Sequence, residues 1–286
     1  MVTLVVVETG PLATVQDLGR HGMAALGVGV SGAADTASLR LGNRLVGNPE
    51  RSAAIELTFG GLAVRTEVAR TVAITGAACP IVVNGRAADM YGPVSVPAGA
   101  LLRVGTPTSG LRSYLAVRGG IDVPEVLGSR STDTLSGLGP APLRAGDLLP
   151  VGLASREFPA IDLAPQPMPL GEPALRVIAG PRQDWFTAAA LDTLCSQPYV
   201  VTAQSNRIGV RLKGGALRRR DDTELPPEAM VLGALQVPPS GQPILFLADH
   251  PVTGGYPVIA VVVLADLRHA AQARPGTSLR FTTAAH

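Results

Sequence analysis

Short apolar runs separated by turn-forming residues set the pattern of this chain. Val, Ile, Leu and Tyr cluster in the runs, and Gly, Pro or Asn bounds them. Runs of this length and composition are typical of β-strands rather than of helices, which show a period of 3.6 residues. The pattern predicts a mainly β fold with strands at Leu4–Val7, Val72–Ile74, Ile81–Val83, Leu101–Val104, Tyr114–Val117, Leu175–Ile178, Tyr199–Thr202, Ile244–Leu247 and Val258–Leu264.

Helical signals are few. Asp35 can cap a helix that ends at Gly47, a typical stop residue. Asp184 can cap a second helix that runs to Leu194, and Asp266 can cap a short third one. Closed barrels hide the edge strands that an open sheet exposes. So few helices among so many strands therefore favour β-barrels that are closed or nearly closed.

A proline-rich stretch divides the chain. From Glu157 to Pro173 the chain carries five prolines, a spacing that supports neither a helix nor a central strand and is typical of an extended connector. We therefore predict an N-terminal β-barrel domain over residues 1–153, a connector over 154–173 and a C-terminal β-barrel domain over 174–286.

The composition narrows the class of partner. The 286 residues include 24 Lys and Arg against 22 Asp and Glu, a balance that excludes a nucleic acid or an anionic membrane as the main partner. The longest apolar run, Val258–Ala265, is far shorter than the ~20 residues of a membrane-spanning helix. No basic segment precedes Leu4–Val7 as it would in a signal peptide. We expect a globular, turn-rich, cytoplasmic protein.

Lysine, cysteine and histidine usage excludes several kinds of site. Lys213 is the only lysine and Gly214 follows it, so the Gly-Lys-Ser/Thr of a phosphate-binding P-loop is absent. No methionines flank Lys213 as they would in a biotin carrier. Cys79 and Cys195 are too few for a disulfide framework, and neither these nor the four histidines show metal-ligand spacing. No metal site is predicted.

Three stretches combine glycine or polar residues in ways that fit a site. Gly27–Gly32 matches G-x-G-x-x-G, but no βαβ unit surrounds it, so we interpret it as a flexible loop near a ligand or a partner. Thr14–Arg20 forms either a polar site or an exposed ion pair of Asp17 with Arg20. Gly254–Tyr256 lets the backbone approach a ligand, although a plain turn between strands has the same signature.

Nine stretches form an ordered set of motifs along nearly the whole chain. They are Thr14–Arg20, Gly27–Asp35, Asn43–Asn48, Glu56–Thr58, Gly119–Asp122, Leu127–Thr132, Ser205–Gly209, Gly233–Pro239 and Thr253–Pro257. Together they resemble the biotin-dependent carboxyltransferase or allophanate hydrolase subunit 2 family. That family includes the carboxyltransferase half of urea carboxylase, the antagonist of the Kip sporulation-kinase inhibitor and the C subunit of prokaryotic 5-oxoprolinase. Pro227–Ala229 and Val252 depart from its usual Ser-Glu-Gly and Thr.

The resemblance implies a fold, a partner and a reaction class. It implies two β-barrel domains with cyclophilin-like topology, a few short helices, and a sibling, known as subunit 1 or B. In this family 5-oxoprolinase opens the lactam of 5-oxoproline with ATP, and urea carboxylase passes CO₂ from carboxybiotin to urea. Because the chain has no P-loop, we expect ATP to bind with or on a partner subunit, and we expect the isolated chain to be inactive.

Both reactions activate a nitrogen of a urea or amide and stabilise an oxyanion. Preorganised hydrogen-bond donors stabilise the oxyanion, and each donor contributes about 3 kcal/mol to the stabilisation of the transition state. Membership in the motifs and position beside them imply two sets of site residues. The catalytic set is Asp249, Tyr256, Asp35 and Glu56. The substrate-binding set is Gln16, Arg20, Ser31, Asn43, Asn48, Arg207, Gln236 and Thr253.

Three functions stay open at this point. The first is a subunit of an ATP-dependent amidohydrolase of the 5-oxoprolinase type. The second is a biotin-dependent carboxyltransferase that acts on urea or a related small amine, with carboxybiotin as the donor. The third is a non-catalytic regulatory partner of a kinase-inhibitor protein. The separate chain favours the first, because the urea enzyme is usually one long polypeptide with its own biotin carrier.

Overall fold

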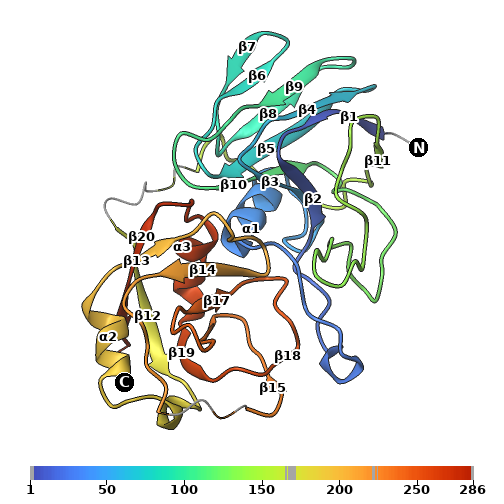
Figure 1. The fold of residues 1–286 in the computed structure, drawn as a ribbon. Coiled ribbons are helices and arrows are strands. Elements are labelled where there is room, and N and C mark those ends of the chain that lie inside the picture. The colour runs from blue at the N-terminus through green and yellow to red at the C-terminus, as the bar shows by residue number, and fades with distance from the viewer. Residues whose placement is uncertain (1–2, 165, 167–171, 221–222, 224, 285–286) are drawn as a thin grey trace. The chain divides into compact units, whose positions relative to one another are not determined.

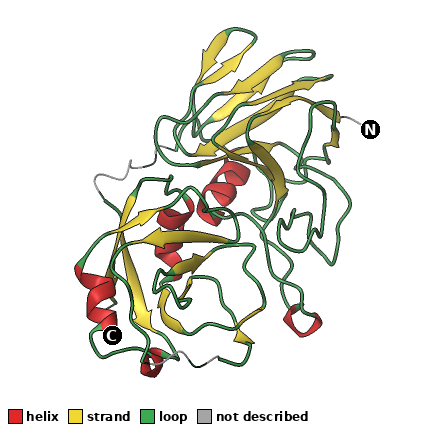
Figure 2. Cartoon of the chain, viewed as in Figure 1, coloured by secondary structure: helices red, strands yellow, loops and turns green. Residues whose placement is uncertain are grey.

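The computed structural model describes residues 3–164, 166, 172–220, 223 and 225–284 (Figure 1). Strands make up most of the regular structure and the helices are short (Figure 2), which confirms the predicted mainly β fold. The chain forms two compact units. Unit 1 comprises Met1–Arg20, Ser31–Asp133 and Gly137–Pro167, and unit 2 comprises His21–Val30, Thr134–Ser136 and Met168–His286.

The domain limits derived from the prolines stay a prediction. Residues 165 and 167–171 of the connector lie outside the described residues. Among the residues that the structure does describe, no helix is long and apolar enough to cross a membrane.

Unit 1 is built from two sheets. Their strand orders are β11-β1-β4-β9-β6-β7 and β2-β3-β10-β5-β8, and all the pairs within them are antiparallel. The strands are β1 Thr3–Thr9, β2 Leu12–Gln16, β3 Ala54–Thr58, β4 Leu62–Thr66, β5 Arg70–Gly76, β6 Ile81–Val83, β7 Arg86–Ala88, β8 Pro93–Val96, β9 Leu101–Val104, β10 Arg112–Val117 and β11 Leu148–Pro150.

The described strands of unit 1 thus form two sheets rather than one closed ring. Sharp turns at Gly10 and Gly60, both with positive φ, take the chain from one sheet to the other. A Cβ on Gly10 would lie 1.9 Å from the carbonyl oxygen of Gly60. Only glycine fits such an approach in this conformation, so these turns fix where the chain changes sheet.

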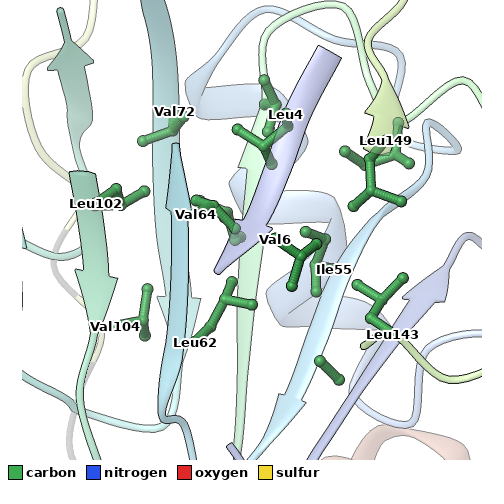
Figure 3. Packing of buried hydrophobic residues seen from close by; sticks show 14 of the residues in the cluster. Leu4, Val6, Ile55, Leu62, Val64, Val72, Leu102, Val104, Leu143 and Leu149 are labelled. Atoms are coloured by element: carbon green, nitrogen blue, oxygen red, sulfur yellow. The ribbon is translucent and has the colours of Figure 1, made fainter. Parts of the chain in front are cut away.

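The main core of unit 1 lies between its two sheets (Figure 3). Leu4 and Val64 point inward from the six-stranded sheet, and Ile55 and Val72 point inward from the five-stranded one. All four are at most 2% exposed. The other face of the five-stranded sheet packs against α1 (Thr36–Leu45), which begins at Asp35 as predicted.

Unit 2 contains a closed barrel of seven strands in the order β12-β19-β16-β17-β14-β13-β20. Parallel pairing of β12 with β20 closes it, and its other pairs are antiparallel. The strands are β12 Ala174–Ala179, β13 Tyr199–Val201, β14 Gly209–Lys213, β16 Ala234–Gln236, β17 Ile244–Phe246, β19 Val258–Val262 and β20 Ser278–Thr283. The short strands β15 Glu228–Ala229 and β18 Thr253–Gly254 pair separately.

One predicted helix start is wrong. Asp184 lies in a 3₁₀ turn, η2 (Gln183–Trp185), and α2 (Ala190–Ser196) begins only at Ala190. The buried Phe186 between them is extended and forms a β-bridge with Arg219, which stops the helix from continuing.

The short helix predicted after Asp266 is present, but the Asp266 side chain does not cap it. Asp266 ends the 3₁₀ turn η3 (Leu264–Asp266) and precedes α3 (Leu267–Ala271) with helical backbone angles. Its carboxylate instead accepts three hydrogen bonds from the backbone and guanidinium of Arg176, at 2.8–2.9 Å. Hydrogen bonds to a charged guanidinium are stronger than those to a backbone N–H. The Asp266 carboxylate oxygens therefore bind Arg176 and do not cap the helix.

Candidate functional site

The predicted site residues fall into two sets, one in each unit, and each set is described within its own unit. Unit 1 holds Gln16, Arg20, Ser31, Asp35, Asn43, Asn48 and Glu56; unit 2 holds Arg207, Gln236, Asp249, Thr253 and Tyr256. All but Thr253 and Tyr256 are buried. Buried polar side chains are hydrogen-bonded as a rule, so the networks around them show what each one does.

A row of polar side chains crosses the side of the five-stranded sheet that packs on α1. Thr14 of β2 is the register partner of Glu56 on β3, and Glu56 is the partner of Tyr114 on β10. Thr75 of β5 is the next partner of Tyr114. Register partners lie on the same face of a sheet, so the row is one continuous polar line beneath α1.

Glu56 and Asp35 meet at Tyr114 in this row. The Tyr114 hydroxyl donates to Glu56 Oε2 (2.7 Å) and accepts the backbone N–H of Asp35 (2.8 Å). Glu56 Oε2 also accepts the N–H of Ala34 (2.9 Å), and the Arg112 guanidinium lies 3.6 Å from Oε1. Burial, reinforced by the charges of Glu56 and Asp35, raises the pKa of Tyr114 well above its usual value. The hydroxyl therefore stays protonated and holds the start of α1 on the sheet.

Asp17 organises a second polar cluster in unit 1. Its carboxylate accepts the hydroxyls of Ser129 (2.7 Å) and Ser131 (2.5 Å) and the backbone N–H of Arg130 (2.7 Å). Asp17 is 8% exposed and Arg20 is 1% exposed. No ion pair joins them within the part of the chain that the structure describes. The interpretation of these two residues as an exposed pair is wrong, because both side chains turn inward and hold a loop.

Gln16, Arg20 and Ser31 converge on the same loop. Gln16 Nε2 and the Ser31 hydroxyl both donate to the carbonyl oxygen of Thr132, at 2.9 and 3.2 Å. Arg20 Nη2 donates to the neighbouring carbonyl oxygen of Ser131 at 2.5 Å. The structure therefore brings three of the predicted substrate-binding residues together around a single dipeptide.

Asn43 and Asn48 serve the turn that follows α1. Asn43 Nδ2 donates to the carbonyl oxygens of Ser52 (2.7 Å) and Glu50 (3.2 Å). Asn48 Nδ2 donates to Asn43 Oδ1 (3.1 Å) and to the carbonyl oxygen of Val117 (2.8 Å). A side-chain amide has two N–H donors, and both are used in each residue. Neither amide has an N–H left for a substrate.

In unit 2, Arg207 and Asp249 form a buried, bidentate ion pair. Arg207 Nε donates to Asp249 Oδ2 (3.0 Å) and Nη2 donates to Oδ1 (2.9 Å), and the side chains are 1% and 0% exposed. The backbone N–H and hydroxyl of Thr134 add bonds of 3.0 and 2.6 Å. Burial acts to raise the pKa of Asp249, but Arg207 and Thr134 outweigh it, so this pKa lies below its ordinary value. Asp249 is an ionised anchor at neutral pH.

The pair holds one end of the loop that carries Thr253 and Tyr256. At the other end, Gln236 Nε2 donates to the carbonyl oxygen of Tyr256 at 3.0 Å. The Tyr256 side chain is 43% exposed, and its hydroxyl makes no hydrogen bond to another described residue. The loop is thus fixed through buried groups at both ends, while the phenol remains available on the surface.

Gly254 lies directly against the Gln236 amide that holds this loop. A Cβ at Gly254 would lie 2.5 Å from Gln236 Nε2 and 3.2 Å from Met230 Cγ. Gly254→Ala is expected to displace the Gln236 amide and to lower the free energy of unfolding by about 1–3 kcal/mol, measured by urea denaturation. Gly255→Ala is the matched control, because its Cβ would meet only the Leu225 carbonyl oxygen at 3.6 Å. Equal destabilisation by both substitutions would contradict this packing.

The described residues offer no metal cluster, and two of their segments do not fit a triphosphate. No three His, Cys, Asp or Glu side chains among them are grouped to hold a metal ion. Phosphates bind at helix N-termini through free N–H groups, but at the start of α1 the Asp35 carboxylate accepts the Ser38 N–H and would repel a phosphate. The Gly27–Gly32 stretch follows a 3₁₀ turn, η1 (Ala24–Leu26), and not a strand.

Several residues of these networks were not predicted. Ser129, Ser131 and Thr132 belong to one of the nine motifs, but no role was expected for them. Thr134, two residues further on, binds Asp249 across 115 positions of sequence. Tyr114 sits within an apolar run, and a hydroxyl-bearing residue in a fully buried strand was the available signal for it.

Comparison with known proteins finds one matching family model and several relatives of known structure or name. The family model described as "Carboxyltransferase domain, subdomain A and B" matches residues 26–283. The C subunit of 5-oxoprolinase from Escherichia coli (strain K12) is 39% identical over 281 residues, which are 97% of this chain and 90% of that protein. The crystal structure of K. lactis urea amidolyase matches 99% of this chain with a TM-score of 0.92 and 31% identity.

This chain covers different shares of the lengths of its relatives. It spans only 19% of the K. lactis urea amidolyase chain. It spans 55% of another solved chain, TTHA0988, with a TM-score of 0.90 and 35% identity. These two solved chains are therefore longer than this one, whereas the E. coli protein is matched over 90% of its length.

Proposed function

We propose, from the premise that this chain belongs to the family of the carboxyltransferase domain, subdomains A and B, that it is a subunit of an ATP-dependent amidohydrolase of the 5-oxoprolinase type. Its substrate is a small lactam or amide, and it works in the cytoplasm. The observation that carries the proposal is the 39% identity to the C subunit of E. coli 5-oxoprolinase, because this identity extends over 90% of that relative. The family membership confirms the resemblance drawn from the motifs.

In unit 2 we assign the contact with substrate to Tyr256. Its exposed hydroxyl can donate to the polarised carbonyl oxygen of an amide or lactam, and one such donor contributes about 3 kcal/mol to transition-state stabilisation. Asp249 and Gln236 are positioning residues, because each binds the loop through buried groups. The lowered pKa of Asp249 supports orientation rather than proton transfer near neutral pH.

In unit 1 we assign to Glu56 and Asp35 the positioning of the start of α1. Asp35 caps the helix through Ser38, and Glu56 accepts the Tyr114 hydroxyl. Both carboxylates already receive hydrogen bonds within the unit, so their part in catalysis is to position the backbone around Ala34.

We connect the ATP site with the partner subunit. The described residues contain no P-loop, and the start of α1 already holds a carboxylate. We therefore place the nucleotide on a sibling subunit of the B type, or at a site that this chain completes. The naming of the E. coli relative as one subunit of an enzyme supports a partner of this kind.

Carboxyl transfer to urea is the second candidate. The similarity to K. lactis urea amidolyase favours it, since 99% of this chain is covered there at a TM-score of 0.92. In that case carboxybiotin would come from a partner, because Lys213 is not flanked by methionines. A non-catalytic role as the partner of a kinase inhibitor is a third candidate, and no contact in either unit favours it.

The partner requirement leads to a direct test. The purified chain alone is expected to release no glutamate from 5-oxoproline and ATP above background, because it lacks a recognisable nucleotide site. Coexpressed with its sibling subunit, it is expected to elute from gel filtration as one complex that restores turnover. Full turnover by the single chain, or separate elution of the two at micromolar concentration, would overturn the proposal.

A further inference from the structure

Three arginines of unit 1 surround a single carboxylate on the surface at the C-terminal end of α1. Arg44, in the last turn of α1, donates to Glu50 Oε1 at 2.7 Å, and Arg40 Nε lies 3.8 Å from Glu50 Oε2. The Arg44 hydrogen bond, together with the charges of Arg44, Arg40 and Arg156, lowers the pKa of Glu50 although burial opposes them. One negative charge therefore faces three positive ones.

This excess of positive charge is local. Over the ranges that make up unit 1, the sequence has equal numbers of arginines and acidic residues and no lysine. Within the described part of the chain, only Glu50 forms an ion pair with Arg40 or Arg44, and both arginines are about half exposed. Like charges gathered on one surface repel each other, and this repulsion is relieved when an anionic surface binds.

An exposed aromatic ring belongs to the same surface. Phe158 is 48% exposed, and the Arg118 guanidinium lies over its ring at 5.2 Å from the centroid. Arg118 also donates to the carbonyl oxygens of Val46 and Arg156, each at 2.8 Å. Arg118 thus ties the segment that carries Arg156 and Phe158 to the turn that follows α1.

The same segment packs closely on this turn. Gly47 has a φ of 68°, and a Cβ there would lie 2.6 Å from the carbonyl oxygen of Glu157 and 3.1 Å from Pro159 Cδ. Only glycine allows this approach in this conformation. Side chains on a backbone that is already fixed lose less conformational entropy on binding. Arg156 and Phe158 are therefore presented on a preorganised segment.

Arginine beside an aromatic residue is the composition that protein–protein interfaces favour, whereas lysine is depleted there. We propose that Arg40, Arg44, Arg156 and Phe158, here called the basic patch, form a docking surface for an acidic face of the sibling subunit. The guanidiniums would bind carboxylates of that subunit, and the Phe158 ring would pack against an apolar side chain. This inference rests on the proposed function, which requires a sibling subunit, and identifies the surface of unit 1 that binds it.

The position of the basic patch favours a protein carboxylate over a phosphate of ATP. Free phosphates bind at helix N-termini, where backbone N–H groups point outward. At a C-terminal end, the carbonyl oxygens and the negative end of the helix dipole repel an anion that approaches the backbone. The long arginine side chains reach beyond the backbone, so carboxylates on a broad protein surface can meet them.

The double variant Arg40→Gln/Arg44→Gln tests the basic patch. In surface plasmon resonance with the sibling subunit immobilised, it is expected to associate about tenfold more slowly than the wild type at low salt. The difference is expected to shrink at about 0.5 M NaCl, because salt screens exposed charges. The melting temperature is expected to change little, since exposed ion pairs contribute little to stability.

Arg103 provides the matched control. It also lies in unit 1, pairs with Glu8 at 2.8 Å and is 47% exposed, against 54% for Arg44. Arg44→Gln and Arg103→Gln therefore remove the same charge from the same kind of ion pair. Only Arg44→Gln is expected to slow association, by about threefold. Equal association rates for these two variants would overturn the proposal.

Phe158→Ala tests the aromatic part of the basic patch. Its complex with the sibling subunit is expected to dissociate about tenfold faster than that of the wild type, because the ring is lost from the interface. Leu148→Ala is the control, since Leu148 is 62% exposed on β11 of the other sheet of unit 1. This variant is expected to dissociate as the wild type does. Equal dissociation rates for wild type and Phe158→Ala would overturn the place of the ring in the docking surface.

ATP is the other anion to test on the basic patch. Calorimetric titration of the isolated chain with ATP is expected to show no binding that depends on Arg40 and Arg44. ATP binding by the wild type that is lost in Arg40→Gln/Arg44→Gln would assign these arginines to a nucleotide and overturn the proposal.

Failure of the docking surface and failure of the proposed function give different results. Slower association of the double variant, where the wild-type complex does not turn 5-oxoproline over, would support the basic patch and reject the function. Unchanged association of the double variant, where the wild-type complex hydrolyses 5-oxoproline with ATP, would reject the basic patch and leave the function standing. A wild-type chain that does not bind the sibling subunit at all would reject the basic patch and the partner requirement together.

Discussion

Arg207→Met is expected to lower the free energy of unfolding by about 3–5 kcal/mol, because it leaves the Asp249 carboxylate buried without the cation that neutralises it. Both side chains of the pair are at most 1% exposed, so solvent cannot take over the role of the guanidinium. Urea denaturation at pH 7 with the two-state free energy as the readout measures the effect.

Arg176→Met is the matched control for this substitution. Arg176 also forms a bidentate pair, with Asp266, but its side chain is 54% exposed. Water and salt screen such a pair, so the melting temperature is expected to change little. A loss of stability as large as that of Arg207→Met would show that burial is not the cause.

The lowered pKa of Asp249 determines how this ion pair's contribution to the stability of the wild type depends on pH. A group whose folded-state pKa is depressed stabilises the fold above its unfolded-state pKa, and that contribution is lost as the pH falls through the folded-state value. The ordinary value is 3.8, so the contribution of the ionised Asp249 to the stability of the wild type is expected to be full near neutral pH. This contribution is lost as the pH falls below about 4.

Tyr256→Phe is expected to reduce turnover of the assembled complex about tenfold or more while leaving stability within about 0.5 kcal/mol of wild type. The hydroxyl is exposed and makes no hydrogen bond to another described residue, so its removal costs the fold little. The comparison of kcat/KM with the melting temperature measures both effects together.

Tyr199→Phe is the control with the opposite expectation. The Tyr199 hydroxyl is buried in the barrel core and donates to the carbonyl oxygen of Gly215 at 2.8 Å. Burial raises its pKa to about 12. Its loss is expected to cost about 0.5–1.5 kcal/mol of stability with activity retained. If Tyr256→Phe keeps full activity, the Gly254–Tyr256 loop is a structural turn.

Local signals predicted the strands and α1 because the forces that make them are local. Asp35 lies directly before its helix, and its cap bond reaches only three residues ahead. The helix start predicted at Asp184 is wrong because Phe186 pairs with Arg219. No residue near Phe186 in the sequence indicates this long-range contact. Tertiary pairing then decided the local structure.

The candidate site was predicted in part for the same reason. The motifs identified Gln16, Arg20 and Ser31, but their convergence on the Ser131–Thr132 dipeptide depends on contacts across more than 100 positions of sequence. The exposed ion pair of Asp17 with Arg20 was a sound local expectation. It failed because a distant loop offers Asp17 hydroxyl donors and offers Arg20 carbonyl acceptors.

The most direct test of the proposed function is the rate at which the complex of this chain with its sibling subunit releases glutamate from 5-oxoproline, with and without ATP. We expect glutamate formation that requires both subunits and consumes ATP in step with it. We also expect no carboxylation of urea by the same complex when carboxybiotin is supplied. ATP-independent glutamate release, or carboxylation of urea without any action on 5-oxoproline, would contradict the proposed function.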